Sequence, residues 1–394
     1  MTEKKKIFTR TIVTLSLVSL FNDVSSEMLI PIMPVYLTSI GFSALWIGAL
    51  EGFAEAVVGF SKGYFGKRSD VSGKRISFVR AGYFLSAVSK SAIGLFSNVP
   101  WVFAARTGDK IGKGVRTSAR DALLADESSH ENRGKVFGFH RGMDTVGAVI
   151  GPTFAIIFLG YFPQHYRPLF FYAFIPAMIG VMLTFSLKQH VFHKKKDSGK
   201  KGFFSYFSYW NDSSSSYKKV SVGLILFALF NSSDVFLIMM AKHQGLNDQL
   251  ILTVYIFYNI VFALSSYPLG SLADKIGMKT MFMTGLFFYI LMYSIFPFTK
   301  SFPVIIILFF VYGLYAACND GIAKAWISKL CMPEDKATAI GFYSSMTSIA
   351  AVIASTLTGF LWVNISASGA LLISAAGVFL SLLYFLIYNI KQPS

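Results

Sequence analysis

Several charged side chains lie in a stretch that is flanked on both sides by apolar runs of membrane-spanning length. The stretch extends from Trp101 to Asp126 and contains Arg106, Asp109, Lys110, Lys113, Arg116, Arg120 and Asp121. A charge at the centre of a bilayer costs roughly 2.5–3.5 kcal/mol on insertion scales, so such residues face a water-filled cavity or partner charges on neighbouring helices. We therefore expect this stretch to form a helix that lines a solute pathway.

Charged side chains of this stretch recur at the spacing of one helix face. Arg106, Asp109, Lys113, Arg116 and Arg120 follow one another at steps of three or four residues, which stacks side chains along successive turns. Guanidinium groups bind carboxylate or phosphate through a bidentate fork. We predict that Arg116 and Arg120, with Lys113 and Arg106, bind an anionic group of a solute. In the alternative interpretation, these charges form a structural network with nearby carboxylates.

Carboxylates on the neighbouring runs are candidates for proton coupling. A buried carboxylate can change its protonation state as a cavity opens to either side, because desolvation and a nearby arginine shift its pKa in opposite directions. The main candidates are Asp23, Glu27, Glu51 and Glu55. The ionic set of the first five runs also includes Asp109, Asp121, Arg141 and Asp144. For Asp23, Glu27, Glu51 and Glu55 the alternative role is ion pairing with the cations of the stretch Trp101–Asp126. For Arg141 and Asp144, three residues apart, it is pairing with each other.

The second half of the chain has fewer polar residues within its apolar runs. Asn231, Asp320 and Lys324 are the predicted solute-facing residues there, and Asp234 follows a Phe-Asn pair as Asp23 does. Aromatic side chains are expected to supply a milder wall, namely Phe230, Phe236, Tyr255, Tyr258, Tyr312 and Tyr315. Packing against other helices or lipid is the alternative role for most of them.

The composition requires a membrane to position these residues. Hydrophobic residues make up 54% of the 394 positions and Asp, Glu, Lys and Arg only 14%, which excludes an ordinary soluble domain. Apolar runs of about twenty residues, enough to cross a hydrocarbon core of about 30 Å, recur along the chain. The twelve predicted runs are Thr11–Thr38, Leu45–Phe65, Ile76–Phe96, Trp101–Leu123, Lys135–Gly160, Leu169–Leu187, Val220–Lys242, Leu250–Gly270, Thr280–Phe298, Val304–Leu330, Ala337–Val363 and Gly369–Ile390. We predict an all-α integral membrane protein with twelve transmembrane helices.

The positive charge of the chain indicates topology. The formal net charge is +16, but Lys and Arg concentrate before the first run and in alternate connections, while the intervening connections contain almost none. This is the positive-inside pattern, so both termini and the long middle segment are expected in the cytoplasm. The protein itself is expected in the inner membrane of the cell. A nucleic-acid partner is not expected. The two cysteines and the scattered histidines have no metal-site spacing, and we expect no metal, cofactor or enzymatic activity.

The middle segment divides the chain into two similar halves. Residues 1–187 and 220–394 are predicted as two six-helix bundles, and residues 188–219 are basic and Ser-rich, typical of a linker. The linker is expected to be loosely ordered, or to lie as a short amphipathic helix on the membrane around Phe203–Trp210. A motif after the second run, with Gly66, Asp70, Gly73 and Arg75, recurs 204 positions later after the eighth run as Gly270, Asp274, Gly277 and Lys279. At the same offset Arg116 matches Asp320 and Arg120 matches Lys324.

With these motifs the chain resembles the major facilitator superfamily of secondary transporters over essentially its full length. The repeated motif matches the signature of that superfamily. Gly138, Gly147, Gly151 and Pro152 fit the helix-five pattern of many of its proton-coupled antiporters, although Thr153 and Phe154 depart from the small residues that usually follow. The strings RTGDKIGKGVRTSARDALLAD and FNDVSSEMLIPIMPVYL are similar to a bacterial branch whose members mostly lack an assigned substrate.

The resemblance implies alternating access, with two six-helix halves rocking about a central site. The repeated motif is then expected to act as a gate, with Asp70 at the positive N-terminal end of a helix from the other half. We predict a monomeric, proton-coupled transporter of a small anionic or zwitterionic organic solute. A proton-coupled exporter of apolar or cationic compounds and a non-transporting membrane sensor are the alternatives. The cargo and the direction of transport do not follow from the sequence.

Overall fold

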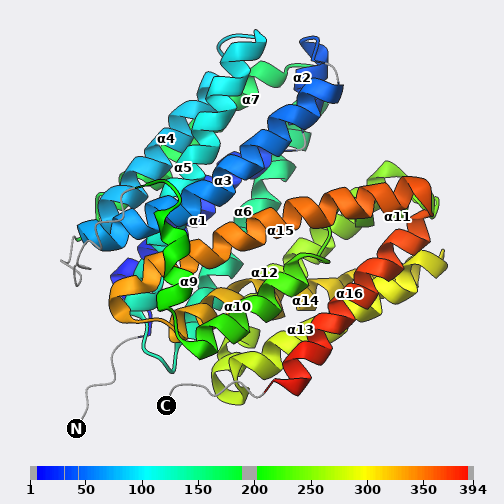
Figure 1. Ribbon diagram of the computed structural model, residues 1–394. Helices are drawn as coiled ribbons and strands as arrows, with labels where there is room; N and C mark the ends of the chain where they lie inside the picture. The colour runs from blue at the N-terminus through cyan, green and yellow to red at the C-terminus, as the bar shows by residue number, and fades with distance from the viewer. Residues whose placement is uncertain (1–6, 31, 43, 189–201, 389–394) are drawn as a thin grey trace. The chain divides into compact units, whose positions relative to one another are not determined.

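The computed structural model describes residues 7–30, 32–42, 44–188 and 202–388, and in this part of the chain the regular structure is helical throughout (Figure 1). Each of the twelve predicted runs coincides with one helix or with two successive helices, so the predicted all-α membrane fold is confirmed. The helices of the first six runs are α1 (Arg10–Leu29), α2 (Met33–Ser39), α3 (Ala44–Ser72), α4 (Arg75–Ala92), α5 (Val99–Glu127), α6 (Arg133–Tyr161), α7 (Tyr166–Tyr172) and α8 (Phe174–Thr184).

The helices of the remaining six runs follow a short linker. They are α10 (Ser215–Ala228), α11 (Val235–His243), α12 (Asp248–Ile276), α13 (Met278–Ile295), α14 (Phe302–Lys329), α15 (Lys336–Asn364) and α16 (Ala367–Ile387). By length and composition, eight helical stretches of the described chain can cross a membrane. Helix α5 is not among them because its charges exceed what a lipid-facing span tolerates, and α10 and α11 are individually too short.

Side-chain caps mark where several helices begin. The Asn98 side chain accepts a hydrogen bond from the Trp101 amide at the start of α5, and Asn247 accepts one from Leu250 at the start of α12. Ser366 caps α16 in the same way. Such caps satisfy amides that have no partner within the helix, which matters more where water is scarce.

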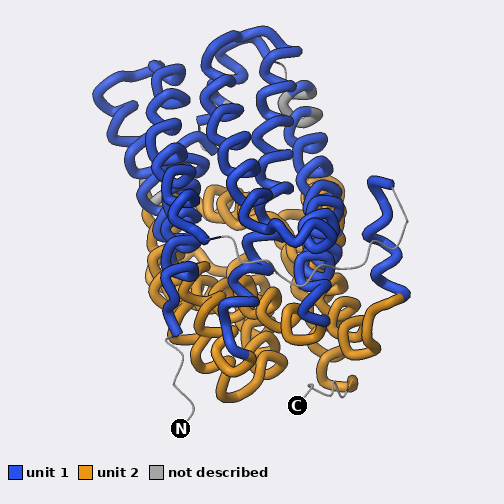
Figure 2. Tube along the Cα trace, turned by 90° about the vertical axis from the view of Figure 1, so that its left-hand side faces the viewer, with its two compact units in different colours: residues 1–129, 143–211, 332–345 blue, residues 130–142, 212–331, 346–394 orange. Residues whose placement is uncertain are grey.

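The chain folds into two compact units, drawn in blue and orange in Figure 2. Unit 1 contains residues 1–129, 143–211 and 332–345, and unit 2 contains residues 130–142, 212–331 and 346–394. Helices α6 and α15 therefore each begin in one unit and continue in the other. The predicted division at the linker, into residues 1–187 and 220–394, stays a prediction.

Each unit is built around one central helix. In unit 1, α5 packs against α3 and α4 and also contacts α1, while α8 packs against α1 and α4. In unit 2, α14 packs against α12 and α13, and α16 packs against α10 and α13. Helices α5 and α14 are the fourth and tenth runs of the sequence, the two that the internal repeat relates. Both central helices are largely buried, so what their side chains contact decides the chemistry of each unit.

The described part of the linker packs against protein. Its residues 189–201 lie outside the described residues, and the rest forms η1 (Ser205–Ser208) and α9 (Tyr209–Asp212). The buried Tyr206 hydroxyl shares a 2.9 Å hydrogen bond with Ser345, and the Lys67 ammonium donates to the Ser205 carbonyl at 3.1 Å. The expectation of a loosely ordered segment is wrong at Tyr206, which is buried against Gly63 of α3. The Phe203, Phe204 and Phe207 side chains are exposed, and the expected position on the membrane surface stays a prediction.

Candidate functional site

A close approach of α4 and α5 encloses the charged face of α5. A Cβ added to Gly82 of α4 would lie 2.7 Å from the Arg116 Cβ, and one added to Gly112 of α5 would lie 2.7 Å from the Ser86 amide nitrogen. Small residues at such positions let helix backbones approach closely in a membrane. The glycines thus place Arg116 and its neighbours in the interior of unit 1, away from lipid.

The first two cations of α5 are paired with carboxylates of α3. The Arg106 guanidinium donates from Nε and Nη2 to Glu51, both at 3.0 Å, and from Nη1 to Asp109 at 3.5 Å. Lys110 pairs with Glu55. Asp109 also accepts a hydrogen bond from Ser86 of α4. For these residues the structure shows the ionic network that the sequence analysis left open as an alternative to solute binding.

Arg120 is held within unit 1 by several partners. Its Nη2 lies 2.9 Å from the carboxylate of Asp121, which is completely buried, and its Nη1 donates to Ser19 of α1 at 2.7 Å. The same Nη1 reaches the Tyr83 hydroxyl at 3.5 Å. With its charge and donors occupied, Arg120 braces α5 against α1 and α4.

Arg116 has a different environment from the other cations of α5 that lie inside unit 1. Its side chain is only 4% exposed, and its guanidinium lies over the Tyr83 ring at 4.4 Å from the ring centroid. Within the described part of the chain the guanidinium makes no hydrogen bond and no ion pair, and its Nη1 atom is buried. A buried cation without acceptors is costly, so this arrangement favours an anionic partner from outside the protein.

A second buried cation, Lys90 of α4, adds to the positive charge here, although it was not among the predicted site residues. Its ammonium donates to the Ser26 hydroxyl at 3.0 Å and to the Asn22 amide oxygen at 3.4 Å, and the side chain is 2% exposed. Both acceptors are neutral. The available signal was a single lysine in the middle of the third apolar run, which the cost of burying charge in a membrane marks as functional or paired.

The remaining predicted residues of unit 1 lie on three helices. Asp23 and Glu27 are half-buried on α1, and Asn22 donates to Asp23 at 3.3 Å. Asp144 of α6 is buried, and its negative charge attracts the Arg120 guanidinium. Lys113 of α5 is exposed, in contrast to Arg116 one turn further on. Each carboxylate of this set keeps its predicted role in proton coupling as a prediction only.

The helix-five glycines serve two packing contacts. A Cβ on Gly147 would lie 2.9 Å from the Asp23 Cβ, and one on Gly151, which precedes Pro152, would lie 2.7 Å from the Met28 amide nitrogen. These two glycines therefore bring α6 against α1 within unit 1. Gly138, in unit 2, faces the Ser266 backbone of α12. The motif gives close helix packing at both ends of α6.

The predicted residues of unit 2 have protein partners of their own. Arg141 forms an ion pair of 2.7 Å with Asp320, and the Tyr315 hydroxyl donates to the Asn231 amide oxygen at 2.9 Å. Arg141 also lies over the Phe262 ring. Lys324, one turn after Asp320 on α14, is half-buried. This set is less charged than that of unit 1 and more aromatic.

Asp234 of unit 2 is a carboxylate that the predicted site residues did not include. It lies where the seventh run is interrupted, between the end of α10 at Ala228 and the start of α11 at Val235. Its Oδ1 accepts a 2.7 Å hydrogen bond from the Tyr312 hydroxyl and its Oδ2 accepts a 3.2 Å bond from the Tyr258 hydroxyl. The signal in the sequence was the Phe-Asn pair three residues before it, shared with Asp23.

The two copies of the repeated motif make equivalent contacts. Asp70 accepts hydrogen bonds from the Ala337 and Thr338 amides at the start of α15, at 3.3 and 2.7 Å, within unit 1. Asp274 accepts from the Gly134 and Lys135 amides at the start of α6, both at 2.9 Å, within unit 2. Both carboxylates thus lie at the positive end of a helix, where the free amides favour an anion.

Glycines and basic residues complete each copy of the motif. Gly66 and Gly270 allow the close approach, because an added Cβ would press on the Ala337 and Gly134 carbonyls respectively. Gly73 and Gly277 adopt positive φ angles of 65° and 96° at the turn between two helices. Arg75 pairs with Asp70 at 2.7 Å and with Asp126, whereas Lys279 donates to the Tyr388 carbonyl at 3.1 Å.

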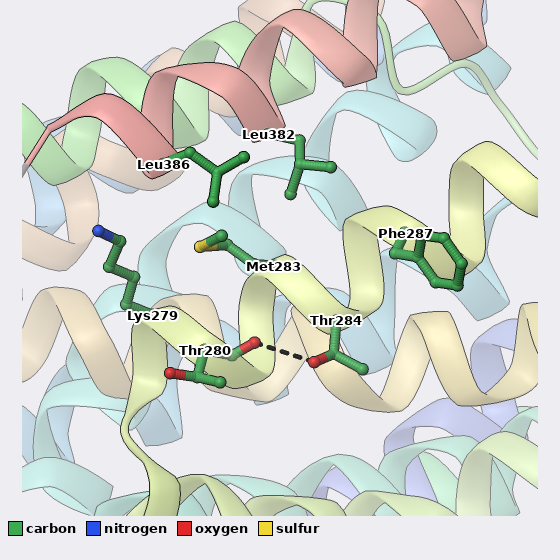
Figure 3. Close-up of a pocket in the computed structure, with 7 residues that line it drawn as sticks. All are labelled: Lys279, Thr280, Met283, Thr284, Phe287, Leu382 and Leu386. Carbon is green, nitrogen blue, oxygen red and sulfur yellow. Dashed lines mark hydrogen bonds between the residues drawn. The ribbon is translucent and has the colours of Figure 1, made fainter.

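A groove on unit 2 adjoins the repeated motif at Lys279 and is otherwise lined by residues not described above. It has a volume of about 590 Å³ and runs between α13 and α16, with the Met283, Phe287, Leu382 and Leu386 side chains in it and Lys279 at one end (Figure 3). Its lining is mostly apolar, as expected of a surface that faces lipid. Among the described residues no cluster of three or more His, Cys, Asp or Glu side chains is arranged to hold a metal ion.

Comparisons with known proteins cover nearly the whole chain. The family model of the Major Facilitator Superfamily matches residues 15–257 and 220–394. "Uncharacterized MFS-type transporter MJ1317" of Methanocaldococcus jannaschii is 31% identical over 366 residues, which cover 91% of this chain and 90% of that protein. "Uncharacterized protein Rv2265" of Mycobacterium tuberculosis is 24% identical over 359 residues, or 90% and 87% of the two chains. The crystal structure of the human organic anion transporter MFSD10 (TETRAN) has a TM-score of 0.81 at 16% identity, covering 95% of this chain and 99% of that chain, which shows a shared fold.

Proposed function

The chain belongs to the major facilitator superfamily, and from this premise we propose that it is a proton-coupled secondary transporter of a small organic anion or zwitterion. Membership makes it a multi-pass membrane transporter and not an enzyme. The proposal concerns what membership leaves open, namely the class of solute, the coupling ion and the residues that contact the solute.

The environment of Arg116 carries the proposal for the solute. The other two arginines on the charged face of α5, Arg106 and Arg120, each have a carboxylate within 3.0 Å, whereas among the described residues the partner of the Arg116 guanidinium is the Tyr83 ring. Burial keeps water from supplying the missing acceptors. A carboxylate or phosphate group would accept from the guanidinium through two parallel hydrogen bonds, and the Lys90 ammonium on α4 would add attraction.

The fixed orientation of the Arg116 side chain supports a binding role. Its guanidinium is stacked on Tyr83, whose hydroxyl contacts Arg120, and Arg120 is anchored by Asp121 and Ser19. The paired charges thus hold Arg116 in place without neutralising it. Preorganisation of this kind reduces the conformational entropy that a solute must remove on binding.

The repeated motif supports alternating access. Asp70 and Asp274 bind the first amides of α15 and α6, the two helices that pass from one unit into the other. Release of both helix ends would let the cytoplasmic end of the pathway open. We place this gate in the cytoplasm, with both chain termini and the linker, in the inner membrane of the cell, and we propose that one chain suffices.

Transport by purified protein in proteoliposomes tests the proposal. Citrate, succinate, glutamate and inorganic phosphate are offered as radiolabelled anions, and tetraphenylphosphonium as a cation, with and without an inward proton gradient. We expect uptake of at least one anion that Arg116→Gln reduces about 30-fold or more, which corresponds to roughly 2 kcal/mol of lost binding. Arg116→Lys should retain part of it because the charge remains but the fork is lost.

Arg167→Gln is the matched control, because Arg167 is an exposed arginine of unit 1 that contacts the Leu95 carbonyl. It should transport as the wild type does. Unchanged anion uptake in Arg116→Gln, at equal protein level, would contradict the assigned solute site.

A second candidate function is proton-coupled export of apolar or cationic compounds. The specific observation in its favour is the aromatic lining of unit 2, where Tyr258, Tyr312 and Tyr315 gather beside Asp234. Aromatic faces and a carboxylate attract organic cations. Proton-driven movement of tetraphenylphosphonium that Arg116→Gln leaves intact would favour this candidate over anion transport.

A further inference from the structure

The break between α10 and α11 exposes backbone and places a carboxylate in the middle of a membrane-spanning run. Residues 229–234 are not helical, and the Tyr289 hydroxyl donates to the Phe230 carbonyl there at 3.1 Å. The neighbouring Ser232 hydroxyl shares a 3.0 Å hydrogen bond with Tyr293. Non-helical backbone at membrane depth occurs where protein or a water-filled cavity surrounds it, so this break is a built feature of unit 2.

Tyrosine hydroxyls are the partners of the Asp234 carboxylate. Tyr312 of α14 and Tyr258 of α12 donate to its two oxygens, and both tyrosine side chains are buried. Their rings lie 5.1 Å apart, and Tyr315 packs against Tyr312 at 5.0 Å. Across the described residues, Asp234 has no cation in an ion pair. Two neutral donors orient the carboxylate but leave its negative charge uncompensated.

The charged and titratable groups around Asp234 are otherwise engaged. Arg141 of α6 and Asp320 of α14 form an ion pair of 2.7 Å with each other, and the Arg141 guanidinium lies over Phe262, which stacks on Tyr258. Five tyrosines also surround Asp234, namely Tyr255, Tyr258, Tyr293, Tyr312 and Tyr315. Lys324 of α14 is more distant. A proton arriving at Asp234 would break no ion pair.

Several carboxylates of unit 1 differ in this respect. Glu51 is bound by Arg106, Glu55 by Lys110 and Asp121 by Arg120. Protonation of any of them would leave a cation without its partner, and a buried unpaired charge is strongly destabilising. Asp234 loses no such partner, because a protonated carboxyl can keep one tyrosine donor and itself donate to the other tyrosine oxygen.

We propose that Asp234 is the proton-binding site of this transporter, with Tyr258 and Tyr312 as positioning residues for its carboxylate. The step rests on the proposed proton-coupled function. A hydronium ion in the water gives up one proton, so that its O–H bond breaks and a water molecule is left while an O–H bond forms on a carboxylate oxygen, and one tyrosine hydroxyl rotates from donor to acceptor. Release to water on the other side of the membrane reverses the same step, so each cycle moves one proton across.

Infrared difference spectroscopy of the purified full chain in lipid nanodiscs tests the site without any solute. The probe is the proton, and the readout is the carbonyl band of a protonated carboxyl group as the pH is lowered. We expect a band that is lost in Asp234→Asn and kept in Glu55→Gln, a matched variant at a paired carboxylate. Persistence of the full band in Asp234→Asn would overturn the proposal.

If Asp234→Asn folds poorly, Tyr312→Phe tests the same proton-binding site. This variant removes one hydroxyl donor to the charged form, so the band should appear at higher pH than in the wild type. An unchanged midpoint would contradict the positioning role and the assignment together. The anion-binding proposal fails separately, if citrate, succinate, glutamate and inorganic phosphate all leave the wild-type thermal stability unchanged.

Discussion

Helices α5 and α14 hold the same place in their units but carry different chemistry. Helix α5 presents a row of cations, and Arg106, Lys110 and Arg120 among them are matched by carboxylates. Helix α14 presents the Tyr312 hydroxyl to the Asp234 carboxylate, and its Asp320 forms an ion pair with Arg141. Two helices in equivalent positions thus carry different side chains. We propose that unit 1 binds the charged group of the solute and that unit 2 binds the proton.

The contacts of the repeated motif show the opposite behaviour, since they are alike in both units. Asp70 and Asp274 each bind two backbone amides at the start of a helix, and Gly66 and Gly270 each permit the close approach. The contacts that pack these helix ends are therefore alike in both units, whereas the polar side chains of α5 and α14 differ. Variants that separate these two classes test the comparison.

The largest expected effect belongs to Arg120, the anchored cation of unit 1. Arg120→Gln would leave the fully buried Asp121 without its partner, and breaking a buried pair costs about 3–5 kcal/mol. We expect a marked fall in the thermal unfolding midpoint of the purified protein. Arg116→Gln breaks no ion pair of the described chain, so its midpoint should stay near that of the wild type. Equal losses in both variants would show that Arg116 is also a structural cation.

A smaller effect is expected at the duplicated motif. Asp70→Asn and Asp274→Asn each weaken charge-assisted hydrogen bonds to helix amides, at a cost of about 1–2 kcal/mol. Asp70→Asn should cost more, because Asp70 also binds the buried Arg75 at 2.7 Å, while Asp274 has Lys329 at 3.3 Å. Chemical denaturation of both variants measures the difference. A larger loss in Asp274→Asn would contradict this ranking.

Much of this arrangement could be read from the sequence because it depends on local patterns. Each predicted run coincides with one or two helices of the described chain, and the spacing of Gly66 and Asp70 against Gly270 and Asp274 revealed the duplicated motif. Which α5 cations pair could not be read, because Glu51 and Glu55 reach Arg106 and Lys110 only through the packing of α3 on α5. Every charge within a membrane-spanning run is costly, so the sequence does not distinguish a paired charge from an unpaired one.

The site in unit 2 was harder to predict for a related reason. Asp234 depends on hydroxyl donors from α12 and α14, and tyrosines are common enough in a membrane protein that their presence marks no particular position. The role of Lys90 was also hard to predict, because a lone lysine among serines shows no pattern of charge. In both places, contacts between helices far apart in sequence decide the chemistry.

The smallest expected effect belongs to the ion pair of unit 2. The Arg141 and Asp320 side chains are 36% and 51% exposed, so the pair should contribute no more than about 1 kcal/mol. Asp320→Asn is expected to lower the unfolding midpoint slightly at low salt, and the difference from the wild type should shrink as salt rises, because ions screen exposed charges. A salt-independent loss as large as that of Arg120→Gln would contradict the contrast between the units.

The most direct measurement of the central claim is an experimental structure of the protein with a transported anion bound. We expect a carboxylate or phosphate oxygen of the solute within hydrogen-bonding distance of the Arg116 guanidinium, with Arg106 and Arg120 still bound to Glu51 and Asp121. A solute bound elsewhere, with Arg116 paired instead to a carboxylate of the protein, would contradict it.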